Sequence, residues 1–280
     1  MAPSMEIAMS IEYPDYDRAI FRVLPTILAE NMSIDIGEYG DFLFTMRSIR
    51  RYFGEADITI VAIFDALAPS TMTGKFHRFW RENDGIELSS IYPTLTAPAI
   101  ISIYTGLPPE IHGIPSTKVY IGEIGNYIDS IRGKTLSSSI PLTKAGVRLE
   151  SFLWEKPILS LLNEDTIACD ILPYGIIGGL RDFYGEYLKP LGYDGFLDAI
   201  YIADRLIDYI ISKNRMGLIF LYFSTMDTFG HDHGIDIHGW REINDMACDI
   251  SQKLINLVEN KNRRIAIYFI SDHGFMPIDR

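Results

Sequence analysis

Residues 218–227 read Leu-Ile-Phe-Leu-Tyr-Phe-Ser-Thr-Met-Asp, so that six apolar residues are followed directly by a polar segment. An uncharged run of this length is typical of a strand that is buried on both faces of a parallel sheet. Strand-like runs also occur at Ile58–Phe64, Ile86–Ile91, Ile167–Leu172 and Ile265–Ile270. We therefore expect one sheet whose strands are mainly parallel.

Helix-like segments lie between these runs, at Thr96–Thr105, Phe196–Ser212 and Trp240–Glu259. Apolar strands that alternate with helices predict an α/β fold, a mainly parallel sheet sandwiched by helices. We assign residues 57–280 to this core. We assign residues 1–56 to an N-terminal helical extension, with candidate helices at Tyr16–Ala29 and Gly40–Phe53.

Two glycine-rich stretches, residues 116–146 and 174–195, interrupt the alternation and are predicted to be loop excursions from the core. The first has the pattern of a hairpin and loop. Each stretch has two interpretations, a lid over a functional site or a plain surface connection.

The composition restricts the class of protein. Of the 280 residues, 48% are hydrophobic, yet no run reaches the ~18 uncharged apolar residues of a membrane span. The segment 1–13 contains no lysine or arginine, unlike a secretory signal, so we expect a soluble cytoplasmic protein that makes no contact with a membrane. Cys169 and Cys248 match no metal-binding spacing and are expected to be free thiols.

The formal net charge of −12 argues against a nucleic-acid scaffold, which would carry surplus lysine and arginine. The charge is compatible with a phosphate-ester substrate, because a bound dication can reverse the local field.

Polar residues that follow the strands are candidates for function, because ligands gather at the carboxyl ends of strands in open α/β sheets. Asp65 follows the first run, where it is either a metal ligand or a helix N-cap. Thr96 lies at a predicted helix start, where backbone N–H groups favour a phosphoryl anion. The alternative is that Thr94 or Thr96 only caps that helix.

Two further strand ends carry aspartate together with histidine. Asp227 and His231 stand four residues apart, and Gly230 permits a turn that brings them together. Residues 231–238 also include Asp232, His233, Asp236 and His238, a density that favours a metal site. Asp272 and His273 can serve one metal if the backbone bends at Gly274, or they form a structural pair.

Four segments occur in an order that resembles a known family. They are Phe64-Asp65, Tyr92-Pro-Thr-Leu-Thr96-Ala-Pro98 with Ser102-Ile-Tyr-Thr-Gly106-Leu-Pro-Pro-Glu110-Ile-His112-Gly113-Ile114, Asp227-Thr-Phe-Gly230-His231-Asp-His-Gly234, and Ser271-Asp272-His273-Gly274. Together they resemble the type I phosphodiesterase / nucleotide pyrophosphatase branch of the alkaline phosphatase superfamily.

This resemblance implies a hydrolase that cleaves phosphodiester or nucleotide pyrophosphate bonds of small-molecule phosphate esters or nucleotides through a phospho-threonine on Thr96. It implies two divalent metal ions, zinc or alternatively manganese. One ion would be held by Asp65, Thr96, Asp272 and His273, and Asp227 and His231 would be ligands of the other. His112 has no metal role in the resemblance and is interpreted as structural.

Two departures from the family pattern affect the expected activity. Many relatives place asparagine three residues after the nucleophile, where this chain has Ala99, so one hydrogen bond to a phosphoryl oxygen is missing. Relatives also supply a third ligand to the Asp227/His231 metal from a downstream histidine, and no histidine follows His273 here. We therefore expect a C-terminally incomplete site, which His233 or His238 would have to complete locally.

Two alternative functions stay open at this point. One is another reaction of the superfamily, on a phosphomonoester, phosphonate or sulfate ester or as a phosphomutase. The other is a catalytically silent relative that binds a metal or another ligand.

Overall fold

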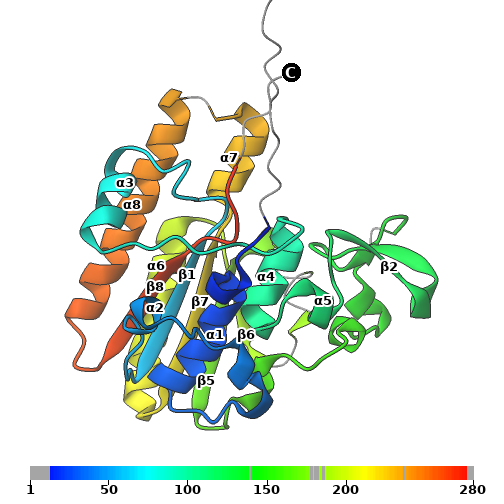
Figure 1. The fold of residues 1–280 in the computed structure, drawn as a ribbon, viewed down its shortest axis with the longest axis horizontal. Helices are drawn as coiled ribbons and strands as arrows, with labels where there is room; N and C mark the ends of the chain where they lie inside the picture. The colour runs from blue at the N-terminus through cyan, green and yellow to red at the C-terminus, as the bar shows by residue number, and fades with distance from the viewer. Residues whose placement is uncertain are drawn as a thin grey trace, which may run out of the picture.

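The computed structural model describes residues 13–138, 140–176, 179, 183–184, 187–235 and 237–275. Its centre is a five-stranded sheet in the order β6-β5-β7-β1-β8, in which neighbouring strands run parallel (Figure 1). The strands are β1 (Ile58–Phe64), β5 (Thr166–Pro173), β6 (Lys189–Tyr193), β7 (Met216–Phe223) and β8 (Ile265–Ile270). The predicted α/β fold with a mainly parallel sheet is confirmed.

Strand β1 lies between β7 and β8, and all seven of its residues are buried. Phe64 of β1 is in register with Phe223 of β7, and Ile63 is in register with Ile270 of β8. The three strands therefore end at the same edge of the sheet. The segments that follow them, beginning at Asp65, Ser224 and Ser271, start side by side.

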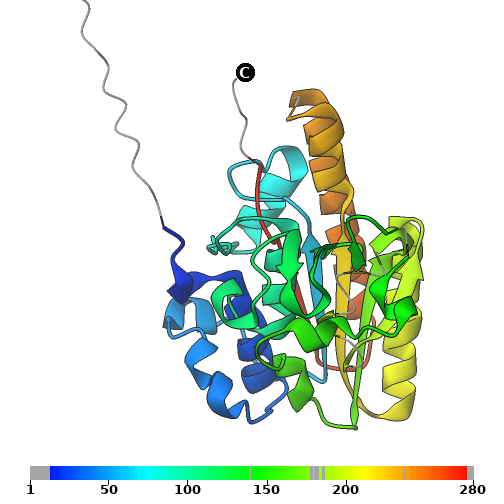
Figure 2. The ribbon, with the colours of Figure 1, turned by 90° about the vertical axis from the view of Figure 1, so that its right-hand side faces the viewer.

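Helices cover both faces of the sheet (Figures 1 and 2). On one face lie α3 (Gly74–Glu82), α6 (Phe196–Lys213) and α8 (Ile237–Glu259), whose buried residues form one apolar cluster with Ile60 and Ala62 of β1. On the other face lie α1 (Val23–Thr26) and α4 (Thr96–Thr105), which pack on Val61 and Ile63. Alternate residues of one strand thus point into two separate apolar layers, as a strand covered on both faces requires.

The N-terminal residues form short helical turns. These are the 3₁₀ turns Tyr16–Arg18 and Ile20–Arg22, then α1, the π-helical turn Ile27–Asn31, the 3₁₀ helix Gly37–Phe42 and α2 (Arg47–Arg50). The predicted helix Gly40–Phe53 is confirmed only at the end of the 3₁₀ helix and in α2, because residues 43–46 between them are not helical. The Arg22 guanidinium donates to the carbonyls of Asp41 and Leu43, and Thr26 Oγ1 accepts from the Phe44 N–H. These tertiary hydrogen bonds stabilise a non-helical conformation of residues 43–46.

Residues 20–28, apart from the half-buried Arg22, are nevertheless buried in the core beside α4. The N-terminal segment therefore packs as part of the main hydrophobic core. The division of the chain at residue 56 stays a prediction.

The strand predicted at Ile86–Ile91 is also wrong. This segment makes one isolated bridge, between Ser89 and Ala19, and lies outside the sheet. Its backbone is bound by the N-terminal turns instead, because the Ile20 N–H donates to the Ser89 carbonyl and the Ser89 N–H donates to the Arg18 carbonyl. Conversely, edge strand β6 was not predicted, because Pro190 and Gly192 are residues more typical of loops than of strands. Proline is tolerated at a sheet edge.

The stretch 116–146 forms a second, antiparallel sheet of β2 (Lys118–Ile121), β3 (Asn126–Asp129) and β4 (Lys134–Thr135). Figure 1 places it beyond the short helix α5 (Pro109–His112), on the side away from the large sheet. In the stretch 174–195, the described part contains a 3₁₀ turn at Tyr174–Ile176 and β6. Both predicted excursions therefore contain short regular elements.

Cys169 and Cys248 are free thiols, as predicted. None of the helices in the described ranges combines the length and the hydropathy needed to cross a membrane.

Candidate active site

The candidate site lies at the sheet edge where β1, β7 and β8 end together. Asp65 follows β1 directly, and Asp272 and His273 follow β8. Asp227 lies in the first turn of α7 (Thr225–His233), the helix that follows β7. Thr96 is the first residue of α4. The parallel register, therefore, brings together side chains that are far apart in the sequence.

The Thr96 hydroxyl is in contact with His273. Thr96 Oγ1 and His273 Nε2 are 3.0 Å apart, and the other ring nitrogen, Nδ1, lies 3.1 Å from the Gly274 carbonyl oxygen. Because a carbonyl only accepts, Nδ1 carries the proton of a neutral ring and Nε2 presents its lone pair to Thr96. The hydroxyl also lies at the N-terminus of a ten-residue helix, where backbone N–H groups favour an anion.

Each of the two buried carboxylates has one oxygen held by hydrogen bonds. Asp272 Oδ1 accepts from the backbone N–H groups of Ala66, at 3.2 Å, and His273, at 2.9 Å. Asp65 Oδ2 accepts from the hydroxyl of Tyr222. The second oxygens, Asp65 Oδ1 and Asp272 Oδ2, are buried and accept no hydrogen bond from any described residue. They lie 3.3 Å and 3.6 Å from His273 Nε2.

This arrangement is electrostatically costly without a cation. Burial raises the pKa of the Asp65 carboxyl well above its usual value, and the carboxylates of Asp272 and Asp227 raise it further. Burial also raises the pKa of Asp272, although His273 opposes that shift. A divalent cation would neutralise these like charges and satisfy the unpartnered oxygens.

The donor set fits such an ion. Asp65, Asp227 and His273 each offer one ligand atom, and these three atoms lie within 4.8 Å of one another. Carboxylate oxygen and imidazole nitrogen together suit zinc, and they also accept manganese. The free oxygen of Asp272 faces the same histidine nitrogen. The described residues of this cluster could therefore hold a divalent metal ion.

His231 lies beside Asp227 but belongs to no such three-residue group within the part of the chain that the structure describes. Residues 225–233 form a helix, so the four-residue spacing places both side chains on one face, with His231 Nε2 3.4 Å from Asp227 Oδ1. The His231 side chain is 71% exposed, against 18% for Asp227. The two side chains therefore lie side by side, and His231 is open to solvent.

Gly230 in the same motif is needed for close packing. A Cβ atom at this position would lie 2.4 Å from the ring of Phe275, which also packs edge-on against His231. The expected local substitutes for a third ligand lie elsewhere: His233 packs on Phe229, and His238 is exposed on α8. Asp236 lies outside the described residues.

His112 lies in the core away from the metal cluster. The Ile114 N–H donates to its Nδ1, so the neutral ring donates from Nε2 to Ser102 Oγ, at 3.0 Å. Burial lowers the pKa of His112 to about 3. These contacts tie α4 to α5 and support the structural interpretation of this residue. Ala99, in turn, is fully buried in α4 and presents only a methyl group.

Two residues that contact the site were not predicted from the sequence. Tyr222 appeared as one more aromatic residue of a buried strand, yet its hydroxyl reaches Asp65. Ser90 Oγ donates to the Asp272 carbonyl at 2.6 Å. The one feature of the sequence that could have indicated Tyr222 or Ser90 as a site residue is that each carries a hydroxyl group close to the end of a predicted strand.

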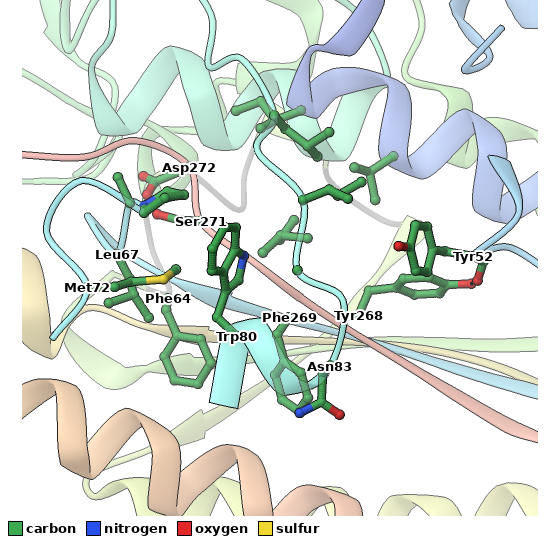
Figure 3. Close-up of a pocket in the computed structure, with 18 of the residues that line it drawn as sticks. Tyr52, Phe64, Leu67, Met72, Trp80, Asn83, Tyr268, Phe269, Ser271 and Asp272 are labelled. Atoms are coloured by element: carbon green, nitrogen blue, oxygen red, sulfur yellow. Dashed lines mark hydrogen bonds between the residues drawn. The ribbon is translucent and has the colours of Figure 1, made fainter. Parts of the chain in front are cut away.

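An apolar cavity of about 710 Å³ lies beside the site, along the edge strand β8. Figure 3 shows Trp80, Phe269 and Tyr268 in its wall, with Ser271 and Asp272 at one end. The cavity thus flanks the segment that carries Asp272 and His273.

A family model described as type I phosphodiesterase / nucleotide pyrophosphatase matches residues 59–280. The chain is 26% identical over 198 residues to an uncharacterized pyrophosphatase/phosphodiesterase of Schizosaccharomyces pombe, a match that covers 66% of this chain and 37% of that protein. It is 25% identical over 204 residues to an ectonucleotide pyrophosphatase/phosphodiesterase of Caenorhabditis elegans, covering 68% of this chain and 22% of that protein. The chain thus spans well under half the length of these relatives.

Solved structures of murine ectonucleotide pyrophosphatase/phosphodiesterase 5 share the fold. One matches with a TM-score of 0.57 and 18% identity, covering 78% of this chain and 57% of that chain. A second, of an inactive threonine-to-alanine variant in complex with AMP, matches with a TM-score of 0.56 and 17% identity, with the same coverage. With the family match over residues 59–280, the resemblance seen in the sequence is confirmed: the chain belongs to the type I phosphodiesterase / nucleotide pyrophosphatase family.

Proposed function

We propose that this chain hydrolyses phosphodiester or nucleotide pyrophosphate bonds, with Thr96 as the nucleophile and divalent metal ions as cofactors. The observation that carries the proposal is the contact of Thr96 Oγ1 with His273 Nε2, 3.0 Å long, beside the ligand atoms of Asp65 and Asp227. Family membership supports the reaction class.

In the proposed reaction, Thr96 Oγ1 releases its proton to solvent and attacks phosphorus, and the bond from phosphorus to the leaving-group oxygen breaks, so that Thr96 carries the phosphoryl group together with the remaining ester group of the substrate. Water then hydrolyses the phospho-threonine and restores the hydroxyl. Asp65, Thr96, Asp272 and His273 would hold one metal ion. A bound dication would lower the pKa of the Thr96 hydroxyl and would neutralise charge on the phosphoryl oxygens.

The protein groups position the nucleophile. The Gly274 carbonyl orients the His273 ring, and the Nε2 lone pair faces the Thr96 hydroxyl. At the N-terminus of α4, the N–H groups of Thr96 and Ala97 would stabilise developing negative charge, whereas Pro98 has no N–H and the Ala99 N–H donates to the Leu95 carbonyl. Without a cation, the carboxylates of Asp65, Asp227 and Asp272 would repel a phosphate anion, which makes metal dependence an essential part of the proposal.

Asp227 and His231 are proposed as two ligands of a second ion. Their separation of 3.4 Å and the exposure of His231 support an open, weak site. Zinc is the proposed metal, because aspartate and histidine form its usual mixed donor set, with manganese as the alternative.

A nucleotide is the proposed substrate class. The murine structural neighbour was solved in complex with AMP, as a threonine-to-alanine variant described as inactive. Ala99 removes one expected donor to a phosphoryl oxygen, and such a loss typically reduces the rate by about 10²–10³-fold. We therefore expect slow turnover of nucleotides by this chain.

Matched substitutions at the nucleophile test the proposal. Thr96→Ala should abolish the chelator-sensitive hydrolysis of bis(p-nitrophenyl) phosphate while bound metal, measured by elemental analysis, is retained. Thr96→Ser keeps a hydroxyl and should keep part of the activity. Full turnover by Thr96→Ala would refute the nucleophile assignment.

A second candidate, a silent relative that binds metal, is favoured by Ala99 and by the open Asp227/His231 pair. Assays with a diester, a monoester, a sulfate ester and a phosphonate separate the two. Tight metal binding without turnover of any of the four would support the silent relative.

A further inference from the structure

Tyr222 is a buried tyrosine of β7 whose hydroxyl donates a hydrogen bond to Asp65 Oδ2. The other oxygen of that carboxylate, Oδ1, accepts no hydrogen bond from any described residue, although it is buried. It lies 3.3 Å from His273 Nε2, and Asp65 offers one carboxylate oxygen to the Asp65/Asp227/His273 cluster. The two oxygens of one carboxylate therefore have different environments, one bound to a hydroxyl and one facing the cluster.

The backbone on both sides of this hydrogen bond is fixed. Tyr222 is in register with Ile63 of β1, and the Asp65 N–H donates to the Phe223 carbonyl at 3.0 Å. The Tyr193 hydroxyl donates to the Tyr222 carbonyl at 2.7 Å. The backbone that carries Asp65 at the end of β1 and Tyr222 at the end of β7 is therefore held by hydrogen bonds.

A hydrogen bond from the phenol limits what the carboxylate can do. A free carboxylate can rotate, and it can bind an ion with one oxygen or with both. With Oδ2 accepting from the Tyr222 hydroxyl, tilting the carboxylate so that both oxygens face one ion would disturb this buried hydrogen bond. The hydrogen bond to Oδ2 therefore favours presentation of Oδ1 alone.

We propose that Tyr222 is a positioning residue that fixes Asp65 as a one-oxygen ligand of the metal ion. This inference rests on the proposed metal dependence and is independent of the reaction that the metal supports. Groups that hydrogen-bond to metal ligands typically change metal affinity by about 10–100-fold when they are removed.

Tyr222→Phe tests the inference, because it removes only the hydroxyl. Dissociation constants for Zn²⁺ and Mn²⁺ are measured by competition with a chelating dye, and melting temperatures are measured with and without saturating Zn²⁺. We expect about 10–100-fold weaker binding of both ions and a smaller rise in melting temperature on adding metal.

Tyr193→Phe is the matched control. It removes a buried hydroxyl that contacts the Tyr222 carbonyl and leaves the Tyr222–Asp65 hydrogen bond in place. We expect metal affinity close to that of the wild type. In an Asp65→Asn background, the further change Tyr222→Phe should have little effect, since the two residues act as one unit.

Wild-type affinity in Tyr222→Phe would overturn the inference, as would an equal loss in Tyr193→Phe, which would indicate general loosening of the fold. A wild-type chain that binds neither ion would overturn it too. If Tyr222→Phe binds metal weakly and the wild type binds it tightly but hydrolyses no phosphate ester, the inference stands and the proposed reaction fails.

Discussion

Acid should destabilise this protein through His112, and the size of the effect follows from the structure. The ring is buried and neutral, and its pKa is about 3, against an ordinary value of 6.5. Between these two values the native state binds fewer protons than the unfolded state. The contribution of the neutral ring to the free energy of unfolding is therefore fully present above pH 6.5 and is progressively lost as the pH falls towards 3. Each pH unit below 6.5 costs about 1.4 kcal/mol, so lowering the pH to 4 costs about 3 kcal/mol.

His112→Asn tests this reasoning, since the Asn side-chain oxygen can still accept from the Ile114 N–H but cannot titrate. At pH 7 the variant should be less stable by about 1–3 kcal/mol, because Ser102 Oγ loses its buried partner. Urea unfolding measures the difference in free energy of unfolding between the wild type and His112→Asn. From pH 7 to pH 4 this difference should shrink by about 3 kcal/mol, so that it disappears or changes sign.

Ser102→Ala provides the control. It breaks the same hydrogen bond but keeps the titrating ring, so its stability should fall with acid as steeply as that of the wild type. A gap between wild type and His112→Asn that is constant from pH 7 to pH 4 would refute the reasoning.

Two further predictions follow from buried polar groups. Because the pKa values of Asp65 and Asp272 are raised, metal binding should release protons, and metal affinity should weaken as the pH falls. Calorimetric titrations in two buffers of different ionisation enthalpy measure this release, and identical heats in both would contradict it. Asn31→Ala should lower the free energy of unfolding by about 1–3 kcal/mol in urea, since Asn31 Nδ2 donates to Tyr268 Oη at 2.9 Å. Hydrolysis should be unaffected, and a variant as stable as the wild type would show that this hydrogen bond contributes nothing.

The centre of the fold was predictable from the sequence because burial on both faces imposes a continuous apolar pattern. The predicted Ile58–Phe64 and Ile265–Ile270 match β1 and β8, and Thr96–Thr105 matches α4. Where the pattern was weaker, long-range contacts decided the structure. Arg22 and Thr26 stabilise a non-helical conformation of residues 43–46 through hydrogen bonds that no local pattern encodes.

The candidate site was predictable to the extent that parallel strands must end at one edge. This rule brings Asp65, Asp227 and Asp272 together without any knowledge of side-chain directions. It could not identify Tyr222, because a tyrosine within an apolar strand has the same pattern whether its hydroxyl meets water or a carboxylate. Nor could it show that residues 225–233 are helical, which places His231 on the same face as Asp227.

The most direct test of the central claim is a search for the phospho-threonine itself. The metal-loaded chain is mixed with bis(p-nitrophenyl) phosphate, quenched in acid during turnover and digested, and the peptides are analysed by mass spectrometry. We expect a p-nitrophenyl phosphoryl group on Thr96, because only one of the two p-nitrophenolate groups leaves when Thr96 attacks, and we expect it to be absent in Thr96→Ala and absent when a chelator is added first. Steady turnover with no phosphoryl group on Thr96, or with the group on another residue, would contradict the account.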